Sequence, residues 1–328
     1  MAKVIGLGNA LVDIMTPLEN DDILTQIKFP KGSMQLVDED MSNDILGLTK
    51  HLESKLASGG SAANTIHGIA RLGMETAFVG KIGTDKYGEI FKNDLVESKI
   101  KPAVFQSQTD TGRAIAMVSP DSERTFATFL GAAVEMTPEE ITPAIFLGYD
   151  MLHIEGYLVF NEELIEKAVK TAKEVGLEIS LDLASFNVVD AKLDFLKNIV
   201  EKYVDIVFAN EEEAKSFTGE EDPQKALEII ARNAKVSIVK IGKEGSLVLK
   251  DNITSKVGVI EAKPIDTTGA GDLYAAGFLY AYLKGLDLEK AGQIGALLAG
   301  KVIEVMGAKI ADETWVQIQK EVSNIAAQ

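Results

Sequence analysis

Residues 151–183 read MLHIEGYLVFNEELIEKAVKTAKEVGLEISLDL, which is a short apolar run, a helical pattern and a second apolar run. In the middle segment, apolar residues recur at the three- and four-residue spacing of a helix with one buried face, as at Leu164, Ile165, Ala168 and Val169. Strand, helix and strand in this order form two parallel strands joined by a crossover helix. The stretch therefore predicts an α/β fold.

Similar apolar runs continue the pattern on both sides. They lie at residues 4–8, 76–83, 205–210 and 236–242, with helical patterns between them. Strands that alternate with helices predict a mostly parallel sheet that is covered on both faces. Because ligands bind such sheets beyond the carboxyl ends of the strands, the loops after these runs are the places to look for a site.

Two stretches interrupt the alternation. Residues 102–130 alternate strands with turns at 109–112 and 119–122, and residues 10–37 contain Pro17, Pro30 and Gly32. Together they predict a small antiparallel sheet inserted into the α/β body, which is either a lid over the site or an edge meander without function. The α/β body then consists of residues 1–9, 38–101 and 131–328.

The composition argues against several classes of protein. With 33 Lys and Arg against 50 Asp and Glu, the formal net charge is −17, which disfavours binding to nucleic acids and to anionic membranes. No cysteine is present, so disulfides, thiolate metal sites and a cysteine nucleophile are excluded. The three histidines, His51, His67 and His153, give little basis for a multi-histidine metal centre. No signal peptide or membrane span is evident, and a cytoplasmic protein is expected.

The segment from Asp266 to Asp272, DTTGAGD, carries the strongest signal for a site because it runs directly into an apolar helix. The first amides of a helix lack partners and carry the positive end of its dipole, so they form an anion site. Asp272 would repel an anion, but it could take the proton of a hydroxyl that attacks a phosphorus atom. Alternatively, Asp272 is a helix-start carboxylate and the glycines only form a tight turn.

Polar groups suited to a polyol follow two other strands. The turn SGGSAAN at 58–64 opens a helix; its small residues admit a ligand, and Asn64 can both donate and accept hydrogen bonds. Asn9 and Asp13 come at the end of the first strand. A helix cap by Ser61 and a solvated loop are the alternatives. GGSAA also approximates the nucleophile turn of a serine hydrolase, which would use Ser61.

Two later segments suit a nucleotide and its metal. Asn210 and Glu213 follow a strand, and their oxygens could hold Mg²⁺ through water. Lys240 begins a turn in which Gly242 and Gly245 could admit a nucleotide phosphate. An acidic helix start and a plain hairpin are the alternatives. No P-loop and no protein-kinase motif set occurs, so any phosphoryl transfer must use another scaffold.

In this order, the motifs resemble those of the ribokinase-like PfkB carbohydrate kinases. DTTGAGDLYAAGFL at 266–279 is similar to the family's C-terminal signature, and GGSAANTIHGIARLG at 59–73, with Gly83, is similar to its N-terminal one. The N-x-x-E motif at 210–213 and the G-x-x-G turn at 242–245 fall in the family's order. The resemblance covers essentially the whole chain. It implies an α/β/α sandwich with a β lid that transfers the γ-phosphoryl group of ATP, with Mg²⁺, to a primary hydroxyl of a small-molecule sugar or nucleoside.

The resemblance also implies roles for individual residues. The catalytic base is Asp272, and the anion hole is formed by the backbone of Gly269, Ala270 and Gly271. Mg²⁺ and the phosphates are served by Asn210 and Glu213, and ATP by Lys240, Gly242 and Gly245. Sugar hydroxyls are bound by Asn9, Asp13, Gly60 and Asn64. A monovalent cation such as K⁺ is held, in many relatives, by the loop that Asp266 and Thr268 match.

The acceptor is predicted from weaker signals. GNALVDI, GKIGTDKYGEIF and ERTFATFLGAA are most similar to adenosine kinases and their bacterial sugar-kinase relatives. Adenosine is therefore the expected acceptor, with ribose, fructose or a ketodeoxy sugar acid as the alternative. Leu158 stands where the resemblance implies an aromatic side chain, so Phe126 is expected to line an adenine slot, with Phe129 and Tyr157 as further candidates. A non-catalytic nucleoside-binding protein remains an alternative, and the chain is expected to be a monomer or a lid-mediated homodimer.

Overall fold

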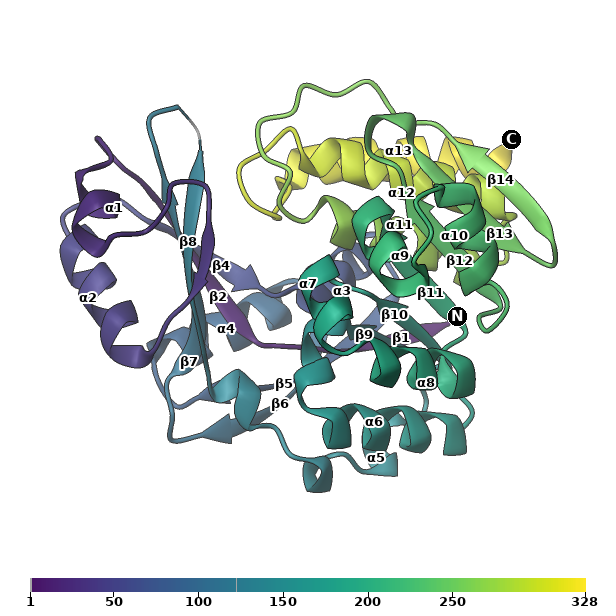
Figure 1. Ribbon diagram of the computed structural model, residues 1–328, viewed down its shortest axis with the longest axis horizontal. Helices are drawn as coiled ribbons and strands as arrows, with labels where there is room; N and C mark the ends of the chain where they lie inside the picture. Colours follow the sequence, from purple (N-terminus) through teal and green to yellow (C-terminus); the bar gives the residue numbers. More distant parts are fainter. Residues whose placement is uncertain (1, 122) are drawn as a thin grey trace.

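The computed structural model describes residues 2–121 and 123–328 (Figure 1). Met1 and Ser122, which fall in the predicted ranges 1–9 and 119–122, lie outside the described residues. The described chain forms a nine-stranded sheet, a separate five-stranded sheet, and helices that pack against both. Within these residues, no helix is both long enough and apolar enough to cross a membrane.

The large sheet is mostly parallel, as predicted. Its strands are β1 (Lys3–Leu7), β5 (Glu75–Gly83), β6 (Ile100–Ser107), β9 (Met151–Glu155), β10 (Glu178–Asp182), β11 (Ile206–Asn210), β12 (Val236–Lys240), β13 (Ser246–Lys250) and β14 (Ile253–Val257). Their spatial order is β14-β13-β12-β11-β10-β9-β1-β5-β6, and only the pairs β12–β13 and β13–β14 are antiparallel. Each of the six runs predicted to be strands of this sheet belongs to it.

Helices cover both faces of the large sheet, so the fold has three layers and the predicted α/β/α sandwich is confirmed. One face packs against α3 (Ser61–Arg71), α4 (Lys86–Glu97), α11 (Ala270–Leu283), α12 (Leu288–Val302) and α13 (Asp312–Ala327). The other face packs against α5 (Pro143–Phe146), α6 (Glu162–Glu174), α7 (Phe186–Ala191), α8 (Leu193–Tyr203), α9 (Glu211–Thr218) and α10 (Pro223–Ile230). Each face has its own apolar core, because strands that are buried on both sides carry apolar residues at successive positions.

The small sheet is a separate body of structure. Its strands are β2 (Leu11–Pro17), β3 (Met34–Leu36), β4 (Lys55–Gly59), β7 (Thr111–Val118) and β8 (Arg124–Gly131), in the order β3-β8-β7-β2-β4. Figure 1 shows α1 (Asp22–Ile27) and α2 (Glu39–Thr49) on the side that faces away from the large sheet. Because this sheet is not joined to an edge of the large one, the edge-meander interpretation is wrong.

Three predictions about the small sheet differ from the structure. The sheet is mixed and not antiparallel, because β2 pairs in parallel with β7 and β3 in parallel with β8. Residues 102–107 were expected in it, but β6 pairs in parallel with β5 in the large sheet. Conversely, residues 55–59 were expected in the α/β body, and they form β4 beside β2. In both cases the strand pairing joins segments distant in sequence, which local pattern does not specify.

Candidate active site

Four neighbouring strands of the large sheet end in polar side chains. Glu155, Asp182, Asn210 and Lys240 are the last residues of β9, β10, β11 and β12. The register places Glu155 beside Asp182 and Asn210 beside Lys240, so their side chains share one face of the sheet. Sequence reasoning missed Glu155 and Asp182. A charged residue that ends a buried strand was the signal that could have found them.

Asp272 lies in the first turn of α11 and faces the start of α3. Its Oδ1 accepts a hydrogen bond from Ser61 Oγ at 2.6 Å, and its Oδ2 accepts one from Asn64 Nδ2 at 3.0 Å. The hydroxyl of Thr65 donates to the backbone carbonyl of Asp272 at 3.1 Å. The two glycine-rich helix starts identified separately in the sequence therefore form one site.

The backbone amides before and within the first turn of α11 are open to a ligand. Gly269 has a φ of 77°, in the left-handed region that favours glycine. The N–H group of Ala270 donates to the Thr267 carbonyl at 3.2 Å, whereas those of Gly269, Gly271 and Asp272 have no acceptor among residues 2–121 and 123–328. A helix start with three free amides suits an anion. The free amides are therefore those of Gly269, Gly271 and Asp272, whereas the resemblance implied those of Gly269, Ala270 and Gly271.

Lys240 and Asp182 lie directly against this helix start. Lys240 Nζ donates to Asp182 Oδ2 at 3.0 Å, and a Cβ added to Gly271 would lie 3.1 Å from that Nζ. Burial lowers the pKa of Lys240, but the carboxylates of Asp182, Glu213 and Asp272 outweigh it and raise the pKa. The ammonium group therefore stays charged beside the anion site.

The carboxyl group of Asp272 is poised to exchange a proton near neutral pH. Burial raises its pKa to about 6, while the hydrogen bonds from Ser61 and Asn64 act in the opposite direction. A general base works best when its pKa lies near the operating pH. The structure therefore places a carboxyl group with a pKa near the operating range next to the free amides of this helix start.

Glu155 organises the residues that were expected to bind hydroxyls. Its Oε1 accepts from the backbone N–H of Asn9 at 2.9 Å and from Asn9 Nδ2 at 2.7 Å, and its Oε2 accepts from the amide of Ala62 at 2.8 Å. Burial raises the pKa of this carboxyl group to about 7 against the effect of these bonds. Glu155 thereby ties the end of β1 to the start of α3.

Two amide oxygens in this region lack hydrogen-bond partners. Oδ1 of Asn9 and Oδ1 of Asn64 are both buried and accept no hydrogen bond from the part of the chain that the structure describes. Such orphaned acceptors are rare in folded proteins because each costs about 1–3 kcal/mol. Gly60, with a φ of 95°, lets the turn before α3 pass close to Asn9, since a Cβ there would overlap the Asn9 backbone carbonyl.

Asp13 reaches the same site from the small sheet. Its carboxylate lies over Gly59, because a Cβ at Gly59 would overlap it. Burial raises the pKa of Asp13 to about 7; Lys309 opposes this shift, and Asp272 and Asp266 add to it. The four residues predicted to bind acceptor hydroxyls, namely Asn9, Asp13, Gly60 and Asn64, are therefore brought together.

Asn210 and Glu213 form a reciprocal helix cap at the start of α9. Glu213 accepts from the Asn210 amide at 2.7 Å and from its Nδ2 at 2.6 Å, and the Glu213 amide donates to Asn210 Oδ1 at 2.9 Å. Burial and the charge of Asp182 raise the pKa of Glu213 to about 7. Carboxylates that repel one another in this way favour a cation between them.

The donor set fits Mg²⁺ held largely by water and phosphate. Within the described residues, no group of three or more acidic or histidine side chains converges on one metal position. Mg²⁺ in phosphoryl-transfer sites keeps several waters and uses one or two carboxylates with the substrate phosphates. Glu213 and Asp182 meet that requirement.

Asp266 and Thr268 are engaged by an arginine of the small sheet. Arg124 forms an ion pair with Asp266 Oδ1 and donates to Thr268 Oγ1. The other oxygen of Asp266 accepts from the amide of Gly307 at 2.7 Å. The side-chain oxygens expected to serve a monovalent cation thus already bind a guanidinium group. Sequence reasoning missed Arg124 because its partner lies about 140 residues away.

Phe126 and Tyr157 are two aromatic side chains that are partly exposed. Phe126 lies on β8 two residues from Arg124, so both point to the face of the small sheet that carries Asp13. Tyr157 is 40% exposed, and burial together with the charges of Asp272 and Glu155 raises its pKa. Two other candidates are excluded from an adenine slot: Leu158 lies in the core, and Phe129 points to the opposite face, against Arg113.

The turn at 242–245 is a hairpin between two antiparallel strands, β12 and β13. Gly245 has a φ of 97°, and a Cβ there would overlap the Val257 carbonyl, so packing against the chain after β14 already requires glycine. At Gly242 the nearest atom to an added Cβ is Glu211 Oε2 at 3.9 Å. The turn therefore leaves room above Gly242, next to the start of α9.

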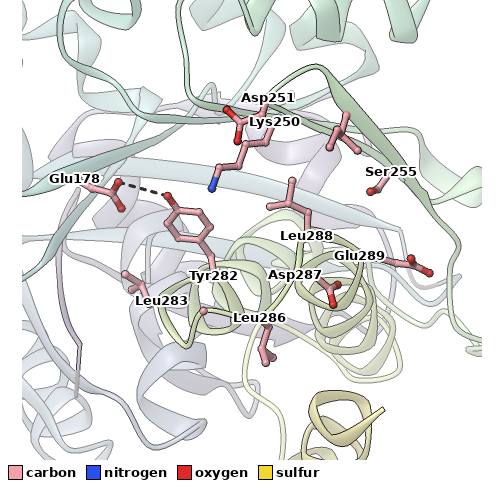
Figure 2. Close-up of a pocket in the computed structure, with 12 residues that line it drawn as sticks. Glu178, Lys250, Asp251, Ser255, Tyr282, Leu283, Leu286, Asp287, Leu288 and Glu289 are labelled. Carbon is pink, nitrogen blue, oxygen red and sulfur yellow. Dashed lines mark hydrogen bonds between the residues drawn. The ribbon is translucent and has the colours of Figure 1, made fainter.

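A surface hollow of about 700 Å³ lies elsewhere on the large sheet (Figure 2). It is lined by Glu178, Lys250 and Tyr282 among others, and the Tyr282 hydroxyl donates to Glu178 at 3.4 Å. Glu178 begins β10, whereas Asp182 ends it. The hollow is thus at the opposite end of the strands from the candidate site.

The serine-hydrolase alternative finds no support in the geometry. Ser61 donates to Asp272 and not to a histidine. His153 is buried beneath the site and bonds Ser180 through Nδ1 at 2.9 Å, and His67 packs against Trp315. A hydroxyl activated by an imidazole is the requirement for that chemistry, and it is not met at Ser61.

Comparisons with known proteins agree on one family. The model of the pfkB family carbohydrate kinases matches residues 43–315. A probable sugar kinase from Rhizobium etli superposes with a TM-score of 0.88 at 33% identity, over 99% of each chain. Adenosine kinase from Sinorhizobium meliloti gives a TM-score of 0.87 at 34% identity, over 98% of this chain and 99% of the other. Adenosine kinase of Saccharomyces cerevisiae is 30% identical over 343 residues, which covers 95% of this chain and 98% of that protein.

Proposed function

Since the chain belongs to the pfkB family of carbohydrate kinases, we propose that it transfers the γ-phosphoryl group of ATP to the 5′-hydroxyl of adenosine. That it is a carbohydrate or nucleoside kinase follows from the family, as does the use of ATP and, in most members, Mg²⁺. The choice of acceptor and the roles of individual residues are the proposal. A non-catalytic binding protein is therefore set aside.

One observation carries the proposed acceptor site. The amide oxygens of Asn9 and Asn64 are buried without a donor among the described residues, and Asn64 bonds the carboxylate of Asp272 through Nδ2. Acceptor hydroxyls are donors that would satisfy both oxygens, and the carboxylate of Asp13 offers a further acceptor. A ribose ring would supply several hydroxyl groups to these acceptors, with its primary hydroxyl facing the carboxylate of Asp272.

The residues divide the reaction between them. Asp272 takes the proton of the acceptor hydroxyl while the hydroxyl oxygen bonds to the γ-phosphorus. The bond from that phosphorus to the β–γ bridging oxygen breaks, and ADP is released. The amides of Gly269, Gly271 and Asp272 hold the transferred group, and Lys240 adds positive charge beside Gly271. Bound near Glu213 and Asp182, Mg²⁺ would neutralise charge on the phosphates. Arg124 supplies the positive charge at Asp266, so no monovalent cation is included.

A base slot would separate nucleosides from free sugars. Phe126 shares the face of the small sheet that carries Asp13, and it is partly exposed. Stacking on an aromatic ring contributes about 1–3 kcal/mol, or roughly 5- to 150-fold in affinity. A second candidate function, a sugar kinase, is favoured by Leu158, which is buried where the family resemblance places an aromatic.

A screen of acceptors tests the proposal. ADP formation from ATP and Mg²⁺ is measured with adenosine, other nucleosides, ribose, fructose and a ketodeoxy sugar acid. We expect adenosine to give 5′-AMP, and Phe126→Ala to raise the KM for adenosine by about 5-fold or more while the KM for any free sugar changes less. Efficient turnover of a free sugar, with no reaction of or inhibition by adenosine, would replace the nucleoside proposal by the sugar kinase.

A further inference from the structure

Lys309 lies between α12 and α13 and joins this segment to two distant ones, β4 and α4. Its Nζ donates to Ser58 Oγ of β4 at 2.9 Å and lies 3.2 Å from Asp94 Oδ2 of α4. About a fifth of the Lys309 side chain is exposed, so the ammonium group is only partly hydrated. A lysine tethered in this way holds its neighbours more firmly than a free surface ion pair does.

Asp94 fastens the end of β4 to α4. Its Oδ2 accepts from the Ser58 backbone amide at 3.0 Å and also from the Ser58 hydroxyl. Ser58 is buried. The backbone amide and hydroxyl of Ser58 and the ammonium group of Lys309 therefore meet at the carboxylate of Asp94. Lys309 completes the cluster because it contacts both Ser58 and Asp94.

The cluster is next to the acceptor residues. Gly59 follows Ser58, and the Asp13 carboxylate occupies the space above its Cα. Gly60 and then the start of α3, with Asn64, come immediately afterwards. Any displacement of Ser58 would move Gly59, against which the Asp13 carboxylate lies, and the turn that leads to α3 and Asn64.

Lys309 is also the cation that acts on Asp13. The carboxylates of Asp272 and Asp266 disfavour the ionised form of Asp13, whereas the charge of Lys309 favours it. Burial lowers the pKa of Lys309 itself; Asp94 and Asp13 act in the opposite direction and favour the charged ammonium, and Arg71 adds to the lowering. His67 also faces this group, and its pKa is lowered by burial and by Lys309, so it is neutral at pH 7.

We propose that Lys309 is a positioning residue for the acceptor: it holds β4 in place and keeps Asp13 ready to accept hydrogen bonds from acceptor hydroxyls. The inference rests on the proposed function only for the statement that Asp13 binds the acceptor. Within the described residues, the polar contacts of Lys309 are with Ser58 and Asp94, and none is with Asp272 or Lys240. Its loss should therefore change KM for the acceptor far more than kcat.

The test compares Lys309→Met with Lys301→Met. Lys301 is a matched control because its side chain is equally exposed and pairs with Glu304 at 3.9 Å near the end of α12, and not with Ser58 or Asp94. With the acceptor that the wild type phosphorylates, we expect Lys309→Met to raise the acceptor KM about 10-fold or more, with kcat within about 3-fold and the KM for ATP unchanged. Lys309→Arg, which keeps the charge, should stay within about 3-fold of the wild-type KM.

The pH dependence adds a readout that simple loosening of the fold would not move. Asp13, whose pKa is raised to about 7 by burial against the effect of Lys309, is more fully ionised at higher pH in both proteins, so the KM defect of Lys309→Met should be smaller at pH 8.5 than at pH 6.5. Ser58→Ala, a milder change in the same cluster, should shift the acceptor KM in the same direction. An unchanged acceptor KM in Lys309→Met, or an equal loss in kcat and in the KM for ATP, would overturn the inference.

Amide hydrogen exchange separates this inference from the proposed function. Lys309→Met should speed exchange at residues 55–64 relative to Lys301→Met, with little change at residues 206–245. If the wild type phosphorylates no nucleoside, the proposed acceptor is wrong, yet faster exchange at 55–64 would still support the positioning role. Equal exchange in the two variants would reject it.

Discussion

Arg124 of the small sheet and Asp266 of the loop before α11 form an ion pair that joins the small sheet to this loop. Asp266 is buried and its second oxygen binds the amide of Gly307, so the guanidinium group neutralises a carboxylate that has little access to water. The order of the anion-binding loop thus depends on a residue of the small sheet.

Arg124→Ala should make the enzyme respond to K⁺. Removing one partner of a buried pair leaves an uncompensated charge and costs about 3–5 kcal/mol, less where water enters. We expect wild-type kcat to differ by less than about 2-fold between K⁺ and tetramethylammonium salts, and the kcat of the variant to fall about 10-fold and recover partly with K⁺. Strong activation of the wild type by K⁺ would instead assign a cation to Asp266.

Asp272→Asn should lower kcat by at least about 10²-fold, which is the range for a positioned general base. ATP binding should be nearly unchanged, as measured by direct titration. Asp287→Asn is the matched control, because Asp287 also stands at a helix start and accepts from the Lys290 amide at 2.9 Å. Because the pKa of Asp272 is about 6, wild-type kcat should decline below that pH as the base becomes protonated.

Glu213→Gln should raise the Mg²⁺ concentration for half-maximal activity more than it changes the acceptor KM. The substitution removes a negative charge that would attract Mg²⁺. Burial and the charge of Asp182 raise the pKa of Glu213 to about 7. Glu140→Gln serves as the control, since Glu140 forms the same kind of reciprocal cap with Thr137. A weakened acceptor with an unchanged Mg²⁺ requirement would remove Glu213 from the metal site.

Glu155→Gln should gain stability relative to the wild type as the pH rises. The pKa of Glu155 is raised to about 7, so the folded state keeps a proton that the unfolded state releases near pH 4.5. Rising pH between these values therefore costs the wild type stability that the variant does not lose. We expect the difference in unfolding free energy to grow by at least about 1 kcal/mol from pH 5 to pH 7.5.

Urea unfolding of both proteins at each pH measures this difference. Only the difference is informative, because buried His67 and His153, whose pKa values are lowered, contribute stability that increases with pH over part of the same range. These contributions are common to both proteins and cancel. A difference that stays constant with pH would show that Glu155 is ionised in the folded state throughout.

Local pattern predicted those parts of the molecule in which neighbours in sequence are neighbours in space. Leu164 to Val169 and the apolar runs around them specified the crossover helix and its strands, and DTTGAGD specified a helix start with open amides. Gly59 and Gly60 marked one turn and Gly269 and Gly271 another, and the structure brings both turns to Asp272.

Residues that act across long distances in the chain escaped prediction. Arg124, Lys309 and Glu155 each have unremarkable neighbours in sequence, and their roles come from partners about 90 to 250 residues away. The same reason explains β4 and β6, whose pairing with β2 and β5 is fixed by tertiary packing. Sequence reasoning therefore predicted the polar residues that the structure brings together better than the residues that hold them in place.

The pairing of Asn9 with Glu155, and of Asn64 with Asp272, sets when the enzyme can first become active during its synthesis. At about 5–20 residues per second, a ribosome needs roughly 13 to 50 s to add the residues between Asn9 and Asp272. Until Asp272 emerges, no nascent chain holds its carboxylate together with Asn9 and Asn64. A messenger truncated upstream of codon 266 would yield a large α/β fragment without activity.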